Sequence, residues 1–260
     1  MNVGIVGCGV MGSAMARIIK GHEEIFLYTR HVENIKDLAK EQGVTLCTSI
    51  EEIGNSCDAV VLAVKPKDLE EIAEELDPVL QKGTLLLSIL VGTPLYRLRS
   101  YFSNPKVFRL LPNIPLLCGM GLIGVADEEE VLAEDKRAVD QILKGLGTTV
   151  WLDEGLMNPF AALTGSSPAF IYLIIEAMIQ AGITVGFKSA EAKELVLRTI
   201  EGSVALLRHT GAEVSEARNA VSLPGGTTIA GLNEMERLNV RHGVISGVLQ
   251  TLERGKEMEE

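Results

Sequence analysis

Hydrophobic positions follow one pattern in the first half of the chain and another in the second. Up to Trp151, short and nearly continuous apolar runs such as 58–66 and 83–90 alternate with stretches of helical spacing. Short continuous runs are typical of strands buried on both faces of a parallel sheet. After Trp151 only helical spacing continues. The pattern predicts a doubly wound α/β domain over residues 1–153 and an all-helical domain over residues 154–260.

The same pattern places the individual elements. Strands are expected at residues 3–7, 25–30, 44–47, 58–66, 83–90, 107–111, 122–125 and 148–151. Helices of the first half are expected at residues 13–20, 31–42, 68–80, 94–101 and 128–146. Helices of the second half are expected at residues 156–163, 169–186, 189–209, 227–237 and 240–258, with a shorter one that ends at Ala220.

The helix expected at 169–186 is unusually apolar. It carries Glu176 and Gln180 near its middle, which favours a buried helix over a membrane-spanning one. Such a helix needs cover on several sides, either from its own domain or from a second copy of the chain. The sequence therefore indicates a dimer but leaves burial within one chain as an alternative.

Composition narrows the classes of partner. The 260 residues carry a net charge of -11, which argues against nucleic acid or an anionic membrane surface as the main partner. No targeting segment precedes the first strand, so we expect a cytoplasmic protein. Cys8, Cys47, Cys57 and Cys118 form no CxxC and are expected as free thiols in a reducing compartment. The four histidines lack metal-ligand spacing, so no metal site is expected.

A glycine-rich turn joins the first strand to the first helix. Residues 7–12 read G-x-G-x-x-G, with Gly7 for the tight turn, Gly9 for close approach to a pyrophosphate and Gly12 for helix–strand packing. A bare motif is weak, but this one follows a strand and opens a helix at the N-terminus. It predicts a Rossmann-type dinucleotide site, with a purely structural turn as the alternative. The motif residues are Gly7, Cys8, Gly9, Val10, Met11 and Gly12.

Residues at the ends of later strands refine this site. Thr29 and Arg30 stand where an NAD-binding domain usually carries an acid, and a guanidinium suits a 2′-phosphate. This favours NADP(H) over NAD(H), unless Arg30 is simply exposed. Lys65 ends another buried strand and is expected either near the cofactor or as an ordinary surface lysine. Asn113, between two prolines, either faces a ligand or belongs to a plain turn.

The second half contains Pro224-Gly-Gly-Thr-Thr228 immediately before a helical stretch. Unpaired N–H groups at a helix N-terminus favour an anion such as a carboxylate, and the hydroxyls of Thr227 and Thr228 can donate or accept beside it. A helix cap with a turn is the alternative.

With these motifs placed, the chain resembles the pyrroline-5-carboxylate reductase family over essentially its whole length. The Pro-Gly-Gly-Thr-Thr stretch is that family's most specific signature. This signature extends over residues 224–232. The other matching segments are residues 7–12, 63–66, 111–115 and 164–169, with Arg241 and Arg254 in the last helix.

The resemblance implies reduction of 1-pyrroline-5-carboxylate to L-proline, the last step of proline biosynthesis, by hydride transfer to a C=N bond. It implies that Thr228 hydrogen-bonds the imine nitrogen and that the backbone of Gly225, Gly226 and Thr227 cradles the carboxylate. The active site would form between the nicotinamide and this loop, contributed by the partner subunit. The C-terminal helices would form a homodimer, with larger assemblies left open. NADPH is the expected cofactor and NADH the less preferred one. The implied cofactor contacts are residues 7–12, Thr29, Arg30, Ala63, Val64, Lys65, Pro66 and Asn113.

Departures from the family pattern cluster at ligand-facing motifs. Leu223 stands where the family has serine before Pro-Gly-Gly, and Leu111 and Ile114 replace methionine and threonine. Ser167 replaces a glycine, and Ile50 stands where an asparagine approaches the adenosine. Two alternatives follow: a reductase of another cyclic imine, and a catalytically weak NADP(H)-binding paralogue with a regulatory role.

Overall fold

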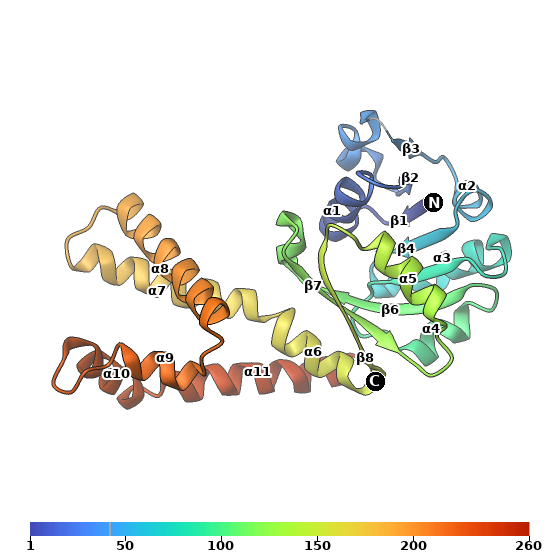
Figure 1. The fold of residues 1–260 in the computed structure, drawn as a ribbon. Helices are drawn as coiled ribbons and strands as arrows, with labels where there is room; N and C mark the ends of the chain where they lie inside the picture. The colour runs from blue at the N-terminus through green and yellow to red at the C-terminus, as the bar shows by residue number, and fades with distance from the viewer. Residues whose placement is uncertain (42, 260) are drawn as a thin grey trace. The chain divides into compact units, whose positions relative to one another are not determined.

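The computed structural model describes residues 1–41 and 43–259, and their helices and strands divide between two units (Figure 1). The first unit comprises Met1–Ser166 together with the C-terminal residues from Thr251, and the second comprises Ser167–Gln250. The expected combination of a doubly wound Rossmann-type domain and an all-helical domain is confirmed. The boundary expected after residue 153 stays a prediction. Helix α6 (Met157–Thr164) belongs to the first unit.

The first unit is built on one sheet with the strand order β3-β2-β1-β4-β5-β6-β7-β8. All neighbouring strands are parallel except β6 and β7, which pair antiparallel, so the expected all-parallel sheet is corrected at this step. The strands are β1 (Asn2–Val6), β2 (Glu24–Tyr28), β3 (Val44–Leu46), β4 (Ala59–Leu62), β5 (Leu85–Ser88), β6 (Lys106–Pro112), β7 (Gly121–Asp127) and β8 (Gly147–Asp153).

Alternate residues of the central strands enter two separate hydrophobic clusters. Ile5 and Val61 pack on the face covered by α1 (Val10–Ile19) and α5 (Ala133–Ile142), whereas Leu62 and Leu86 pack on the opposite face. Helices α2 (Ile50–Ser56), α3 (Leu69–Leu76) and α4 (Leu95–Tyr101) cover that second face. Because both faces are covered, the strands are apolar throughout, which explains their continuous sequence pattern.

Two expected helices differ from the structure. Residues 31–42 were expected as one helix, but the structure has two 3₁₀ segments, Val32–Ile35 and Leu38–Lys40, and Gln42 lies outside the described residues. The helix expected at 128–146 begins only at Ala133, so Glu128–Glu130 do not open it.

A buried arginine ties distant segments together within the first unit. Arg109 in β6 is 2% exposed, and its guanidinium pairs with Glu154 at 2.7 Å and with Glu259 at 2.6 Å. It also donates to the side-chain oxygen of Asn158 at 3.3 Å. One buried cation therefore holds both the segment that follows β8 and the residues just after α11 (Val240–Glu257).

The second unit is helical in its described residues. Helices α7 (Ser167–Thr184) and α8 (Ser189–Thr210) lie side by side, and Gly182 brings α7 close to Ala192 (Figure 1). The unit continues with α9 (Val214–Ala220), α10 (Thr227–Arg237) and most of α11. Only Pro168 of α7 is buried among the residues of this helix.

Candidate active site

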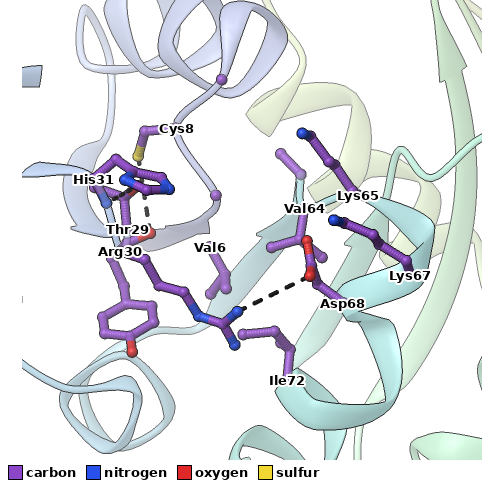
Figure 2. Close-up of a pocket in the computed structure, with 14 residues that line it drawn as sticks. Val6, Cys8, Thr29, Arg30, His31, Val64, Lys65, Lys67, Asp68 and Ile72 are labelled. Atoms are coloured by element: carbon purple, nitrogen blue, oxygen red, sulfur yellow. Dashed lines mark hydrogen bonds and ion pairs between the residues drawn. The ribbon is translucent and has the colours of Figure 1, made fainter. Parts of the chain in front are cut away.

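A cavity of about 400 Å³ opens in the first unit at the carboxyl ends of β1, β2 and β4 (Figure 2). This is the edge at which a doubly wound sheet binds its ligands. Eight predicted cofactor contacts line it: Gly7, Cys8, Gly9, Thr29, Arg30, Ala63, Val64 and Lys65. The turn after β1, the end of β2 and the end of β4 therefore converge as the sequence predicted.

The three motif glycines have distinct structural reasons. Gly7 has φ +96°, a conformation that side chains disfavour, and a Cβ there would lie 2.6 Å from the carbonyl oxygen of Ala63. A Cβ on Gly12 would lie 2.1 Å from the carbonyl oxygen of Gly7, so glycine is required where α1 packs against β1. A Cβ on Gly9 would meet no protein atom within 4 Å and would instead occupy open space beside the cavity. These features fit a pyrophosphate at the N-terminus of α1.

Arg30 extends from the end of β2 toward Asp68 at the opposite wall of the cavity (Figure 2). Its Nη2 lies 2.7 Å from Oε2 of Glu71, and its Nη1 lies 4.0 Å from Oδ1 of Asp68. The hydrogen bond and the charge of Glu71 raise the pKa of Arg30, so the guanidinium stays charged. A fixed positive charge at this strand end suits a 2′-phosphate.

Sequence reasoning missed several residues of the cavity wall. His31 and Tyr28 flank the predicted pair at the end of β2, while Lys67 and Asp68 follow Lys65. Their signal was only their proximity in sequence to predicted strand ends. The additional lining residues are Val6, Tyr28, His31, Lys67, Asp68 and Ile72. Val10, Met11, Gly12, Pro66 and Asn113, which were predicted as cofactor contacts, are not among the residues that line the cavity, and their roles remain predictions.

Asn113 illustrates the alternative that the sequence left open. Its side-chain amide donates to the carbonyl oxygen of Thr164 at 3.1 Å, and its side-chain oxygen accepts from the N–H of Leu122 at 2.8 Å. The side chain is 7% exposed, and these bonds stabilise the loop after β6. This geometry favours the plain structural turn.

The Cys8 thiol belongs to the same turn but is unreactive. It is buried, and burial raises its pKa from 9.0 to about 12. The thiol is therefore protonated at neutral pH and is no nucleophile. Cys47 and Cys57 are also free and buried, whereas Cys118 is free and exposed.

The Pro-Gly-Gly-Thr-Thr segment lies in the second unit and forms the predicted loop before a helix. Gly225 has φ +72°, and Gly226 is the extended N-cap of α10, which begins at Thr227. Thr228 is exposed in the first turn. Among the described residues, the hydroxyls of Thr227 and Thr228 have no hydrogen-bond partner, and no side chain caps the helix. The N-terminus of α10 therefore retains free donors for a carboxylate.

Within residues 1–41 and 43–259, no group of three or more His, Cys, Asp or Glu side chains is arranged to hold a metal ion. In the same part of the chain, one helical stretch, Glu154–Thr184, is long and apolar enough to cross a membrane by length and composition alone.

Comparisons with known proteins match both parts of the chain. Residues 154–258 match the family model described as pyrroline-5-carboxylate reductase dimerisation, and residues 2–92 match the model described as NADP oxidoreductase, coenzyme F420-dependent. Pyrroline-5-carboxylate reductase from Aquifex aeolicus is 32% identical, with 99% of this chain and 97% of the relative covered. The Escherichia coli enzyme is 28% identical, with 98% and 97% covered.

Solved structures give the same answer. Pyrroline carboxylate reductase from Plasmodium falciparum, with NADP bound, superposes with a TM-score of 0.89 at 30% identity and covers 100% of this chain and 98% of its own. The Streptococcus pyogenes 1-pyrroline-5-carboxylate reductase gives a TM-score of 0.89 at 30% identity, with 99% and 98% covered. This chain therefore belongs to the pyrroline-5-carboxylate reductase family.

Proposed function

We propose that the protein reduces 1-pyrroline-5-carboxylate to L-proline with NADPH, the last step of proline biosynthesis. The observation that carries the proposal is the retention of the whole Pro224–Thr228 loop, at the N-terminus of α10, in a chain that matches named reductases over its full length. The free thiols fit a reducing compartment and support a cytoplasmic location.

The cavity in the first unit has the features that NADPH requires. The open space at Gly9 and the N-terminus of α1 suit the pyrophosphate, and Arg30 suits the 2′-phosphate. Lys65 and Lys67 add positive charge to the wall. When bound, the cofactor supplies the hydride. NADH lacks the 2′-phosphate that Arg30 would bind, so it is the weaker alternative.

The loop of the second unit supplies the remaining chemistry. The backbone around Gly225, Gly226 and Thr227 would cradle the substrate carboxylate at the positive end of α10. The Thr228 hydroxyl would donate a hydrogen bond to the imine nitrogen, where electron density increases as the hydride arrives at carbon. Holding the carboxylate and the nitrogen together orients the C=N bond for transfer. We further infer that the substrate meets the nicotinamide in an assembled homodimer.

The homodimer follows from the second unit. Its apolar side chains are largely exposed in the single chain, including Leu173 of α7, and residues 154–258 match the family's dimerisation model. A second copy would remove this surface from water. The apolar helix α7 is thereby assigned to subunit contact, and no membrane or nucleic-acid partner is needed.

A second candidate substrate is suggested by Leu223. This residue is 69% exposed on the loop, where the family has a serine, so the loop presents an apolar group beside the proposed carboxylate site. A different cyclic imine, with an apolar group at that point, is the alternative. Comparing the kcat/KM values of wild type and Leu223→Ser for 1-pyrroline-5-carboxylate distinguishes the two. A large gain in the variant would favour the alternative.

The deciding experiment is NADPH oxidation with and without 1-pyrroline-5-carboxylate. We predict that Thr228→Ala lowers kcat about 100- to 1,000-fold, because one donor to the reacting nitrogen is lost. NADP⁺ affinity should stay unchanged, and Thr228→Ser should retain most of the activity. Thr199→Ala is the matched control, since its hydroxyl bonds only the carbonyl of Leu195 within α8. Full activity in Thr228→Ala would exclude this role for Thr228. Wild type that binds NADP⁺ but reduces no imine would instead support a regulatory paralogue.

A further inference from the structure

The Arg30 guanidinium, proposed to bind the 2′-phosphate, already interacts with two carboxylates of the protein. Arg30 lines the cavity, yet its Nη2 is held at 2.7 Å by Glu71, a residue of α3 that does not line the cavity. Asp68, which does line it, lies 4.0 Å from Nη1. The side chains of Arg30 and Glu71 are 44% and 59% exposed, so the pair is accessible to solvent and can exchange partners.

This pairing has unequal consequences for the two nicotinamide cofactors. A 2′-phosphate must compete with Glu71 for the guanidinium, and it meets the negative charge of the displaced carboxylate at short range. A cofactor with a 2′-hydroxyl carries no charge at that position and leaves the Arg30–Glu71 pair in place. The pair therefore costs binding energy only to the phosphorylated cofactor.

We propose that Glu71 is a specificity-determining residue, which holds Arg30 against α3 in the free protein and so lowers the preference for NADP(H) over NAD(H). The proposal rests on the function assigned above to the cavity. Lys65 and Lys67 line the same cavity and attract a phosphate whichever residue stands at position 71. Glu71 thus moderates the preference and does not reverse it.

The test compares dissociation constants for NADP⁺ and NAD⁺, measured by titration calorimetry on the full-length protein. Glu71→Gln should bind NADP⁺ about twofold to fivefold more tightly, the range expected for one exposed ion pair, and should bind NAD⁺ with unchanged affinity. Glu74→Gln is the matched control. It removes the same charge from an exposed position of α3 that neither lines the cavity nor pairs with Arg30. No change for NADP⁺, or an equal change for both dinucleotides, would overturn the proposal.

A second background tests whether Glu71 acts through Arg30. In Arg30→Gln, the additional change Glu71→Gln should improve NADP⁺ binding less than it does in wild type, because no guanidinium remains to be released and only the repulsion by the carboxylate is lost. A gain of the same size in both backgrounds would overturn the competition mechanism. Wild type that fails to bind NADP⁺ would contradict both this proposal and the proposed function. Binding without turnover of the imine would contradict the proposed function alone.

Discussion

At the scale of single residues, the buried thiols give the protein a defined response to alkaline pH. Burial raises the pKa of Cys57 from 9.0 to about 12. The Cys57 sulfur packs close to Gly4 of β1, where an added Cβ would lie only 3.1 Å from it. The unfolded chain releases this proton near pH 9, whereas the folded protein retains it. The stabilisation is therefore complete below pH 9 and decreases as the pH rises toward 12, by about 1.4 kcal/mol per pH unit.

Urea unfolding at pH values between about 8 and 10.5 measures this contribution. The free energy of unfolding should fall less steeply with pH in Cys57→Ala than in wild type, whatever the absolute stability of the variant. Cys118→Ala is the control, because it removes an exposed thiol. Parallel curves for wild type and Cys57→Ala would show that the folded protein does not hold this thiol protonated.

Spacing in the sequence predicted those residues of the cavity whose role depends only on neighbouring residues in the chain. Gly7 and Gly12 were identified because a tight turn and a close helix–strand contact require glycine at fixed intervals. Glu71 was not identified, because it lies on α3 and Arg30 follows β2. These two elements meet only through the three-dimensional arrangement of the sheet and its helices. Asn113 could not be assigned either, because an amide between two prolines suits a ligand and a backbone loop equally well.

At the scale of elements, two glycines near the turn between β1 and α1 serve different purposes: one leaves room for the nucleotide and the other allows the helix to pack. We predict that Gly9→Ala folds normally but binds NADP⁺ at least about tenfold more weakly, since its methyl group would occupy only the space proposed for the pyrophosphate. Gly12→Ala should instead be destabilised by about 1–3 kcal/mol or more, because its methyl group would overlap the Gly7 carbonyl. Thermal unfolding and calorimetric titration of both variants check this. Equal stability of the two variants would contradict the packing argument.

Strands were easier to predict than the segments between them. Burial on both faces leaves a continuous apolar run, and every expected strand has a counterpart in the sheet. The helix expected at 31–42 was wrong, because its buried residues Ile35 and Leu38 are three apart, a spacing that also fits 3₁₀ segments. The antiparallel step between β6 and β7 leaves no trace in hydrophobicity, since both strands are mostly buried, like the parallel strand β5.

At the scale of the whole molecule, contacts between distant segments were beyond sequence reasoning. Arg109 pairs with Glu154 and Glu259, which lie 45 and 150 positions away in the sequence. The spacing of these two acids does not indicate that they share a partner. The division into a nucleotide-binding part and a helical part was nevertheless predictable. It rests on a change of hydrophobic period along the chain, which each domain requires for its own core.

The exposed apolar surface of the second unit gives the last prediction. Leu173 of α7 is 64% exposed in the single chain, and a homodimer through this unit would bury it. Leu173→Glu should therefore shift the protein from dimer to monomer in light scattering at micromolar concentration, because an unpaired carboxylate would be buried at the interface. Leu132→Glu is the control, since Leu132 is also exposed but belongs to the first unit. A Leu173→Glu variant that remains dimeric would show that this position of α7 lies outside the subunit interface. Loss of turnover together with the dimer, while NADP⁺ binding is retained, would show that the substrate site needs the assembled pair and the cofactor cavity does not.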